Sequence, residues 1–307
     1  MKTDLNAWNV NEKDFPHSGS VEEKLYFCLR YAILSPSTYN TQPWHFRIVK
    51  NKAYIYADRR YALPVVDPDD RELTISCATA LYTLRLAIRY FGYDSTTDIL
   101  PDSDDGCCIA TVKIGEKIDE NDDNLKAIFK AILKRHTNRG VFASKDVPED
   151  SLNRIQKAAT SEGAWLHICD EVEQRNVLRM IAEADHIQTG DKHFRRELAA
   201  WTDPRRAVSH DGLPNLGLGY DEVMHSLTPC LTRRFAIKDK QIASNDELNA
   251  GTPVLVILGT NKGGSIERIK AGQAYMKTWL QAEVEGLSIS PLNQVCEVPS
   301  LRLRLHD

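Results

Sequence analysis

An internal duplication constrains the fold of this chain more than any other feature of its sequence. Residues 24–49, a helix followed by a strand, are matched by residues 151–169, with apolar positions of the two helices 127 residues apart. The first copy has seven extra residues between its helix and its strand, and these are residues 36–42. The extra segment makes the two copies unequal.

The long helices that follow match as well. Ala80 and Gly92 correspond to Ala274 and Gly286 at a constant offset of 194 residues, and a glycine commonly follows a helix end. Each copy is therefore expected to run from helix to strand to long core helix. We predict a fused pseudo-dimer, with one copy over residues 1–118 and the other over residues 119–307.

Hydrophobic periodicity places the individual elements. It predicts helices over residues 21–34, 71–91 and from about 151, and strands over 44–49, 53–57, 107–114 and 165–168. The second copy also contains a long insertion, about residues 187–249, rich in charged residues, glycine and proline. A segment of this length is usually functional or poorly ordered. Two interpretations of the insertion are possible: a lid over a ligand, or a solvated surface loop.

Composition excludes several classes of protein. With 42% hydrophobic and 27% charged residues the chain is typical of globular proteins, and a net charge of −4 argues against nucleic acid as a partner. The seven cysteines form no Cys-x-x-Cys and the nine histidines show no metal spacing, so we expect free thiols and no metal. Neither a signal peptide nor a run of ~20 apolar residues is found, which predicts a cytoplasmic protein without a membrane partner.

The extra segment of the first copy has unusual chemistry, since hydroxyl and amide side chains lie between prolines in Pro36-Ser37-Thr38-Tyr39-Asn40-Thr41-Gln42-Pro43-Trp44. The prolines restrict the backbone and would hold these polar groups in place. Alternating donors and acceptors suit the edge of a heterocycle such as an isoalloxazine ring. An ordinary helix-to-strand turn is the alternative, and composition alone favours it.

A basic segment, residues 134–139, opens the second copy. If it is extended, Arg135, Thr137 and Arg139 point to one side, where two guanidiniums and a hydroxyl would suit a phosphate. The alternative is a solvated basic run at the C-terminal end of a helix over residues 125–134, where cations are favoured by the helix dipole. Taken alone, the segment favours that alternative.

Together the two segments resemble the FMN-dependent nitroreductase family. The pattern Ser-Pro-Ser-x-x-Asn-x-Gln-Pro-Trp after a helix and the pattern Arg-His-Thr-x-Arg at the start of a repeat are similar to that family's motifs. The duplication, residues 67–73 and residues 197–202 resemble its fused, Acg-like branch, and the resemblance covers about residues 20–295. It implies an α+β fold of three layers, α/β/α, in which the tandem repeat forms a pseudo-dimer around a mixed, mainly antiparallel sheet.

The resemblance also implies a flavin site built from both copies. The basic segment would hold the phosphate and pyrimidine edge of FMN through Arg135, Thr137 and Arg139, and His136 matches a motif position without a catalytic role. The other copy would contact the flavin through Pro36, Ser37, Thr38 and Asn40. A third stretch would lie beside flavin N5, with backbone amides as donors: Pro291, Leu292, Asn293 and Gln294. No side chain is implied as catalytic.

The two copies differ at both motifs. The second has Ser161-Glu162-Gly163-Ala164 in place of the polar loop, and the first lacks the basic segment, so one site per chain is expected. The family adds a basic residue near the phosphate from a terminal segment. Arg302 or Arg304 is the expected substitute here.

The function implied by the resemblance is hydride transfer from NAD(P)H to FMN and onward to a nitro compound or quinone. One alternative is an FMN-sequestering protein with little turnover, in which the 187–249 insertion covers the ring and excludes nicotinamide. Another is a fused scaffold that has lost flavin. The expected partners are a small-molecule electron acceptor and NAD(P)H, with the chain as a monomer or a homodimer of fused pseudo-dimers.

Overall fold

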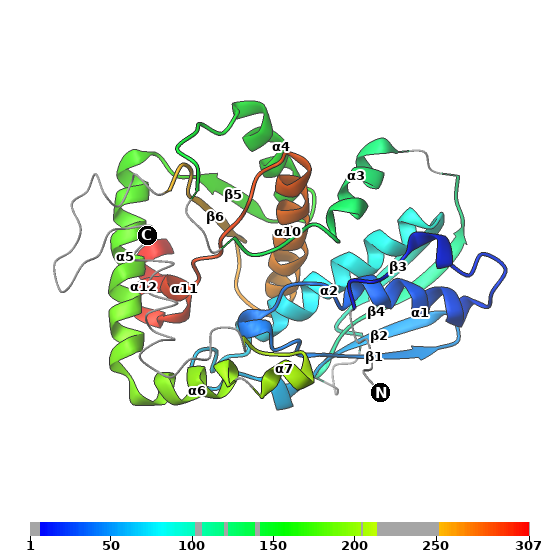
Figure 1. Ribbon diagram of the computed structural model, residues 1–307, viewed down its shortest axis with the longest axis horizontal. Coiled ribbons are helices and arrows are strands. Elements are labelled where there is room, and N and C mark those ends of the chain that lie inside the picture. Colours follow the sequence, from blue (N-terminus) through cyan, green and yellow to red (C-terminus); the bar gives the residue numbers. More distant parts are fainter. Residues whose placement is uncertain are drawn as a thin grey trace.

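A four-stranded antiparallel sheet forms one side of the molecule (Figure 1). Its order is β1-β2-β4-β3, with bounds Trp44–Val49 for β1, Lys52–Ala57 for β2, Tyr93–Ile99 for β3 and Cys108–Lys117 for β4. The β1–β2 hairpin pairs Trp44 with Ala57 and Val49 with Lys52, which leaves residues 50–51 for the turn. The computed structural model describes residues 7–101, 106–119, 122–138, 142–203, 205–213 and 252–306.

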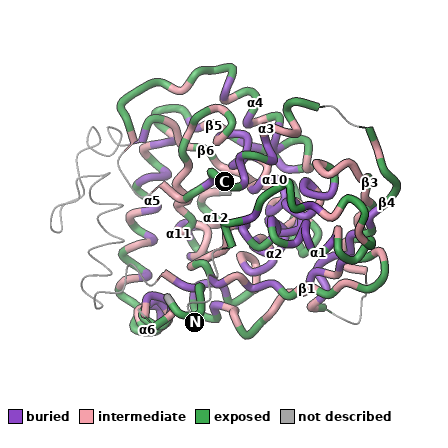
Figure 2. Tube along the Cα trace, turned by 45° about the vertical axis from the view of Figure 1, so that its right-hand side comes forward, coloured by how far each residue is buried: buried purple, intermediate pink, exposed green. Residues whose placement is uncertain are grey.

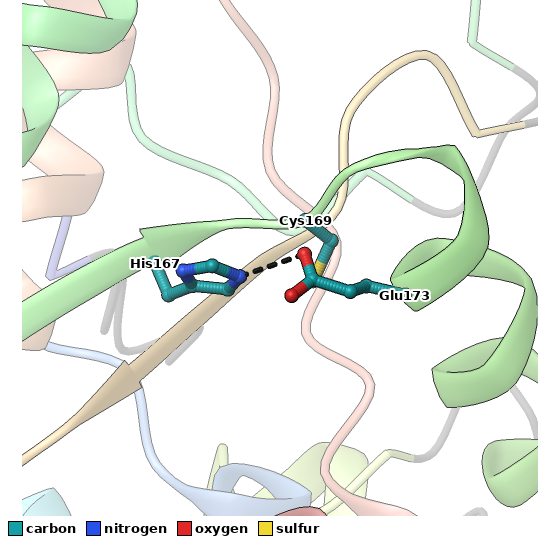
Figure 3. Close-up of side chains that lie close together, drawn as sticks. All are labelled: His167, Cys169 and Glu173. Carbon is teal, nitrogen blue, oxygen red and sulfur yellow. Dashed lines mark hydrogen bonds and ion pairs between the residues drawn. The ribbon is translucent and has the colours of Figure 1, made fainter.

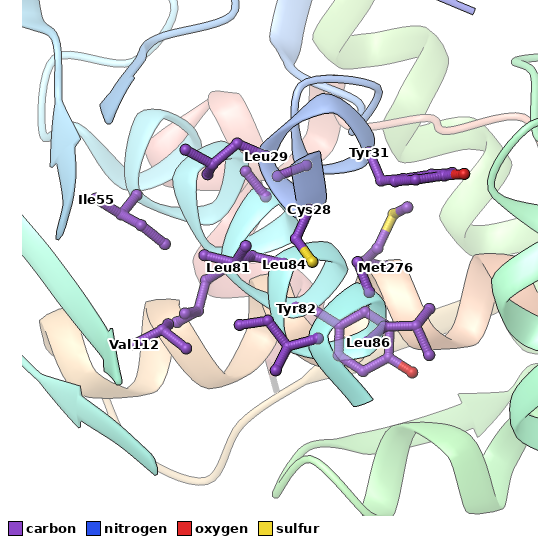
Figure 4. Close-up of a cluster of buried hydrophobic side chains, with 14 of the residues drawn as sticks. Cys28, Leu29, Tyr31, Ile55, Leu81, Tyr82, Leu84, Leu86, Val112 and Met276 are labelled. Carbon is purple, nitrogen blue, oxygen red and sulfur yellow. The ribbon is translucent and has the colours of Figure 1, made fainter. Parts of the chain in front are cut away.

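Helices α1 (Val21–Ala32) and α2 (Arg71–Tyr90) pack against this sheet and against each other. α1 begins with a capping box, in which Ser20 and Glu23 each accept a hydrogen bond from the other's backbone amide. Figure 4 shows how side chains from both helices, the sheet and α10 meet in the core. Its labelled residues are Cys28, Leu29, Tyr31, Ile55, Leu81, Tyr82, Leu84, Leu86, Val112 and Met276.

The centre of the molecule is the crossing of α2 with α10 (Ser265–Val284). Gly272 lies at this crossing. A Cβ there would lie 2.6 Å from the Cβ of Ala78 and closer still to the carbonyl oxygen of Ile75. The two helices can therefore approach each other this closely only because position 272 has no side chain. Figure 2 shows the buried residues concentrated where α1, α2 and α10 meet.

A second, two-stranded antiparallel sheet pairs β5 with β6 on the other side of α10. The elements of this half are α3 (Asp123–Ala131), α4 (Glu149–Thr160), β5 (Trp165–Ile168), α5 (Glu171–Gly190), α6 (Lys192–Thr202), α7 (Arg206–Ser209), β6 (Val256–Gly259), α11 (Gln294–Glu297) and α12 (Pro299–His306). Three short 3-10 helices complete the described residues: η1 (Glu12–Asp14), η2 (Thr38–Asn40) and η3 (Arg59–Tyr61). None of the described helices has both the length and the apolar character needed to cross a bilayer.

The elements of the two halves follow the same order along the chain. The series α1, β1, β2, α2 has its counterpart in α4, β5, β6, α10, with 12 residues in each first helix and 20 in each long helix. Both long helices are followed by a glycine with positive φ, Gly92 at 82° and Gly286 at 70°. These parallels agree with the expected duplication, which remains a prediction.

The structure differs from the sequence-based expectations in the arrangement of its strands and in the inserted segment. The named strands form two separate antiparallel sheets instead of one, because α10 packs between β5–β6 and the helices of the first half. The insertion expected from residue 187 begins inside α5, which continues to Gly190 and is followed by α6. Residues 214–249 of that insertion lie outside the described part of the chain.

Candidate cofactor site

Arg135 is a buried cation that forms no ion pair among the described residues. It follows α3, where its backbone N–H donates to Ala131 O at 2.9 Å, and its side chain turns inward with 7% of the residue exposed. The guanidinium carbon lies 4.7 Å from the centre of the Trp279 ring, and Nη2 donates to Leu34 O at a long 3.4 Å. Nε has no partner, and no described carboxylate forms an ion pair with this side chain. Burial lowers its pKa, because desolvation disfavours the charged form, although the charge of Glu283 partly opposes the decrease.

The polar loop, residues 36–42, begins two residues after Leu34, whose carbonyl Arg135 contacts. Ser37 Oγ accepts a hydrogen bond from the Gln42 backbone at 2.9 Å, which closes the loop on itself. Tyr39, Asn40 and Gln42 have φ values of 51°, 55° and 51°. Left-handed backbone at three non-glycine residues so close together is costly, and such strain clusters at functional sites.

A strap over the polar loop is formed by residues 205–213. The Asn40 side chain donates to Gly212 O at 3.2 Å, Gly212 N–H donates to Asn40 O at 3.1 Å, and Gln42 Nε2 donates to His210 O at 2.8 Å. The strap is fixed at its base by Arg206, which stacks 3.7 Å from the Trp201 ring centre and pairs with Asp211 at 2.9 Å. The amide of Asn40, expected to contact a flavin, is therefore engaged by the strap.

The third expected segment lies beside the basic one. Thr137 and Ile289 form a parallel β-bridge, and Asn138 N–H donates to Ile289 O at 3.0 Å. In the same stretch, Asn293 precedes α11, and the side-chain oxygen of Gln294 is buried without a hydrogen-bond partner.

The remaining expected residues are placed as follows. Pro36 O accepts a hydrogen bond from Thr79 at 3.0 Å, and Leu292 packs beside the apolar cluster of α5 and α11, with Pro291 preceding it partly buried. His136 is exposed, with Nδ1 3.1 Å from Lys134 O. Arg139 lies outside the described residues.

Two acidic residues that the sequence did not single out lie against the polar loop. Thr38 Oγ1 donates to Glu72 Oε2 at 2.6 Å, and Gln188 Nε2 donates to Glu297 Oε2 at 2.5 Å. The carboxyl groups of Glu72 and Glu297 are in contact with each other. We name this the carboxyl pair. Glu72 is in the first turn of α2 and Glu297 ends α11, so only the folded chain brings them together.

The carboxyl pair titrates well above the usual range of glutamate. Burial raises the pKa of Glu72 to about 7, while the hydrogen bond from Thr38 opposes the increase. Burial, followed by the charge of Glu72, raises the pKa of Glu297 well above its usual value. Two carboxyls in contact cannot both ionise easily, so the pair holds a proton at neutral pH.

A small cavity of about 10 Å³, room for one water, lies beside the carboxyl pair. Its basic residues are Arg71 and Arg302, whose side chains both donate to Cys296 O, at 3.3 and 3.1 Å. Arg304, the other expected substitute for the family's terminal basic residue, forms an exposed ion pair with Glu183 at 2.9 Å instead. Of the two, Arg302 lines this cavity, and its expected role near the phosphate stays a prediction.

Contacts in the folded chain link residues at or beside all three expected segments. Arg135 touches Leu34, two residues before the polar loop, and Thr137 bridges to Ile289, two residues before Pro291. Thr38 reaches α11 through the carboxyl pair. Two of the four buried polar side-chain atoms that lack a partner in the described residues belong to Arg135 and Gln294. A ligand with an anionic group and a polar edge would satisfy both.

Comparison with known proteins identifies relatives of the chain. No protein-family model matches the chain. A Mycobacterium tuberculosis H37Rv protein named "Putative NAD(P)H nitroreductase Rv3131" is 27% identical over 275 residues, which cover 89% of this chain and 77% of the relative. A protein of the same organism named "Putative NAD(P)H nitroreductase acg" is 20% identical over 277 residues, which cover 89% of this chain and 81% of the relative. An uncharacterized protein, MT1398, is 23% identical over 285 residues but only 38% of its own length is covered.

These relatives define the class, a two-sheet α/β chain related to proteins named as nitroreductases along most of its length. Over 89% of its length the chain is similar to proteins named as NAD(P)H nitroreductases, Acg among them.

Proposed function

We propose that this chain is an oxidoreductase that binds FMN and uses NAD(P)H to reduce a nitro compound or a quinone. The names of its relatives support the NAD(P)H-dependent class. The observation that carries the cofactor is Arg135, a buried guanidinium with no counter-ion among the described residues. A buried charge without a partner is expensive, so its retention favours an anionic ligand.

The residues present fit FMN. Arg135 would bind the phosphate through its forked N–H groups, and the Trp279 ring packs against the guanidinium. Thr137 and Arg139 would add a hydroxyl and a second cation. The unpartnered Gln294 oxygen would accept from an N–H of the ring edge, and residues 36–40 would contact the other side. When bound, FMN would take hydride at N5 from NAD(P)H and deliver electrons to the acceptor.

Within this proposal one chain supplies both halves of the site. The polar loop comes from the first half and the basic segment from the second, and their contact through Leu34 and Arg135 is internal to the chain. A site complete in one chain needs no dimer.

The visible spectrum of the purified protein, followed by anaerobic addition of NAD(P)H, tests the proposal. A flavin band that bleaches is expected. A protein that neither carries nor takes up FMN would overturn the cofactor assignment and favour the scaffold that has lost flavin.

Arg135→Met separates ligand binding from folding. The methionine retains an apolar stem against Trp279 but removes the charge, so the variant should fold as stably as the parent and bind FMN about 100-fold more weakly, for two lost charge-assisted hydrogen bonds. Arg304→Ala, at an exposed ion pair, is the matched control and should bind normally. Equal FMN affinity in both variants contradicts the phosphate assignment.

A second candidate function is favoured by the strap. Because Asn40 and Gln42 are hydrogen-bonded to the strap, a flavin held there would be covered, and nicotinamide access would be restricted. The chain would then sequester FMN with little turnover. A bound flavin that NAD(P)H leaves oxidised while dithionite bleaches it supports sequestration and rejects the reductase.

A further inference from the structure

A second cluster of potential ligands lies where β5 meets α5 (Figure 3). His167 is in β5, Cys169 follows the strand directly, and Glu173 is in the first turn of α5. The donor atoms of the three side chains all lie within 4.8 Å of one another, and His167 Nε2 is 2.8 Å from Glu173 Oε2. An imidazole nitrogen, a thiol and a carboxylate thus converge on one point.

The local fold positions each of these groups. Side chains two residues apart in a strand point to the same side, which brings His167 and Cys169 together. Asp170 then caps α5, and its backbone N–H donates to Glu173 Oε2 at 2.8 Å in a capping box. The capping box aims the Glu173 carboxylate back at the strand. The cluster is therefore pre-organised, and little side-chain ordering is needed for all three groups to bind one ion.

The thiol has no hydrogen-bond partner within the described chain. Cys169 is 9% exposed, and burial, with smaller contributions from Glu173 and Asp170, raises the pKa of its thiol to about 11. Without a cation the sulfur is therefore protonated. A metal ion close to it would favour the thiolate instead.

Local charge also favours a cation. Asp170, Glu171 and Glu173 are acidic, and the nearest base on α5, Arg175, is directed to Glu171 at 3.8 Å. The positive end of the α5 dipole opposes a cation here. Three formal negative charges outweigh that partial charge.

We propose that His167, Cys169 and Glu173 bind a Zn²⁺ ion, with water in the fourth position. Nitrogen, sulfur and carboxylate ligands together are typical of zinc, whereas Mg²⁺ and Ca²⁺ take oxygen ligands. On binding, the S–H bond of Cys169 breaks, a sulfur–zinc bond forms and the proton goes to solvent. His167 Nε2, which donates its proton to the hydrogen bond with Glu173 when no ion is bound, loses that proton to solvent, Nδ1 takes up the ring proton, and the freed Nε2 lone pair binds the ion.

The ion would tie β5 to the start of α5. Cys169 belongs to the apolar cluster that joins α5 to α11, with Leu178 and Val295 among its members. Bound zinc would therefore stabilise the junction between β5 and α5. This role does not depend on flavin.

Co²⁺ titration of the chelator-treated full chain tests the site, because a thiolate ligand gives a near-ultraviolet charge-transfer band that other ligands do not. We expect that band at one equivalent, its displacement by Zn²⁺, and a higher temperature of unfolding with Zn²⁺ than with chelator. Absence of the thiolate band overturns the proposal.

Variants separate metal binding from helix capping. Glu173→Gln retains a capping-box side chain but loses the charge, so it should fold normally and bind Co²⁺ at least ~10-fold more weakly, as should Cys169→Ser and His167→Ala. Glu171→Gln and Cys107→Ser are matched controls that should bind as the parent does. Unchanged affinity in Glu173→Gln and Cys169→Ser would place the ion elsewhere and overturn the assignment.

Discussion

Helices α2 and α10 carry a tightly packed crossing and also a region in which buried polar groups lack partners. At their crossing, α2 and α10 meet through Gly272 and Ala78 with no space left. Toward one end of each helix, Trp279 supports a cation without an anion, and Glu72 lies against a second carboxyl. At the crossing, close packing is joined by a hydrogen bond from Arg85 to Gln273, whereas the candidate site retains buried polar groups that lower stability. Close packing and the proposed ligand contacts therefore lie at different places along the same two helices.

The crossing should give the largest effect on stability. Gly272→Val would force apart two helices that touch through backbone, so we expect a loss of about 3 kcal/mol in the free energy of unfolding. Urea denaturation measures it. Gly263→Val is the matched control, since a Cβ there meets nothing within 4 Å. Similar urea midpoints for the two variants would show that close packing at Gly272 does not determine the stability of the crossing.

The carboxyl pair should give a smaller effect that depends on pH. The pKa of Glu72 is raised to about 7 in the folded state, so the folded state binds more protons than the unfolded state between about pH 4.5 and 7. Stability should therefore fall as pH rises through that window, by up to about 3 kcal/mol for a shift of this size.

Glu297→Gln removes one member of the pair and should flatten this pH dependence, making the variant more stable than the parent at pH 8 and nearly equal at pH 4.5. Urea midpoints at both pH values measure it. Glu183→Gln, in the exposed pair with Arg304, is the control. A parent protein whose stability does not change across the window would show that the pair is not protonated.

The smallest effect is expected at the contact between the loop and the pair. Thr38→Val removes the hydroxyl that donates to Glu72, which should cost about 1.5 kcal/mol at pH 8, where the acceptor is ionised. Thr38→Ser retains the donor and should cost less. If both substitutions lower the free energy of unfolding equally in urea denaturation, the methyl group of Thr38 matters and its hydrogen bond does not.

Much of the fold could be predicted where periodicity is strong. The expected helices over 21–34 and 71–91 correspond to α1 and α2, and the hairpin strands to β1 and β2, because their apolar faces repeat with the period of each element. β3 was missed because its sequence, Tyr-Asp-Ser-Thr-Thr-Asp-Ile, is half exposed and mostly polar. α11 and α12 are too short to show a period.

The site was only partly accessible to sequence reasoning. Arg135 and Thr38 stand in recognisable segments, whereas the role of Glu297 depends on a contact with Glu72, 225 residues away, that only tertiary packing creates. The proposed zinc ligands have the spacing His-x-Cys-x-x-x-Glu. This pattern is visible in the sequence only when carboxylates are considered together with histidine and cysteine.

The strap has a consequence for how this protein can change. Both amides of the polar loop that hold it, Asn40 and Gln42, bind carbonyl oxygens of the strap and none of its side chains. The contact between loop and strap therefore depends on the main chain of the strap. A residue such as His210 can be replaced by one that adopts the same backbone conformation, and these hydrogen bonds are kept. The side chains of the strap can therefore change while the polar loop beneath keeps its sequence.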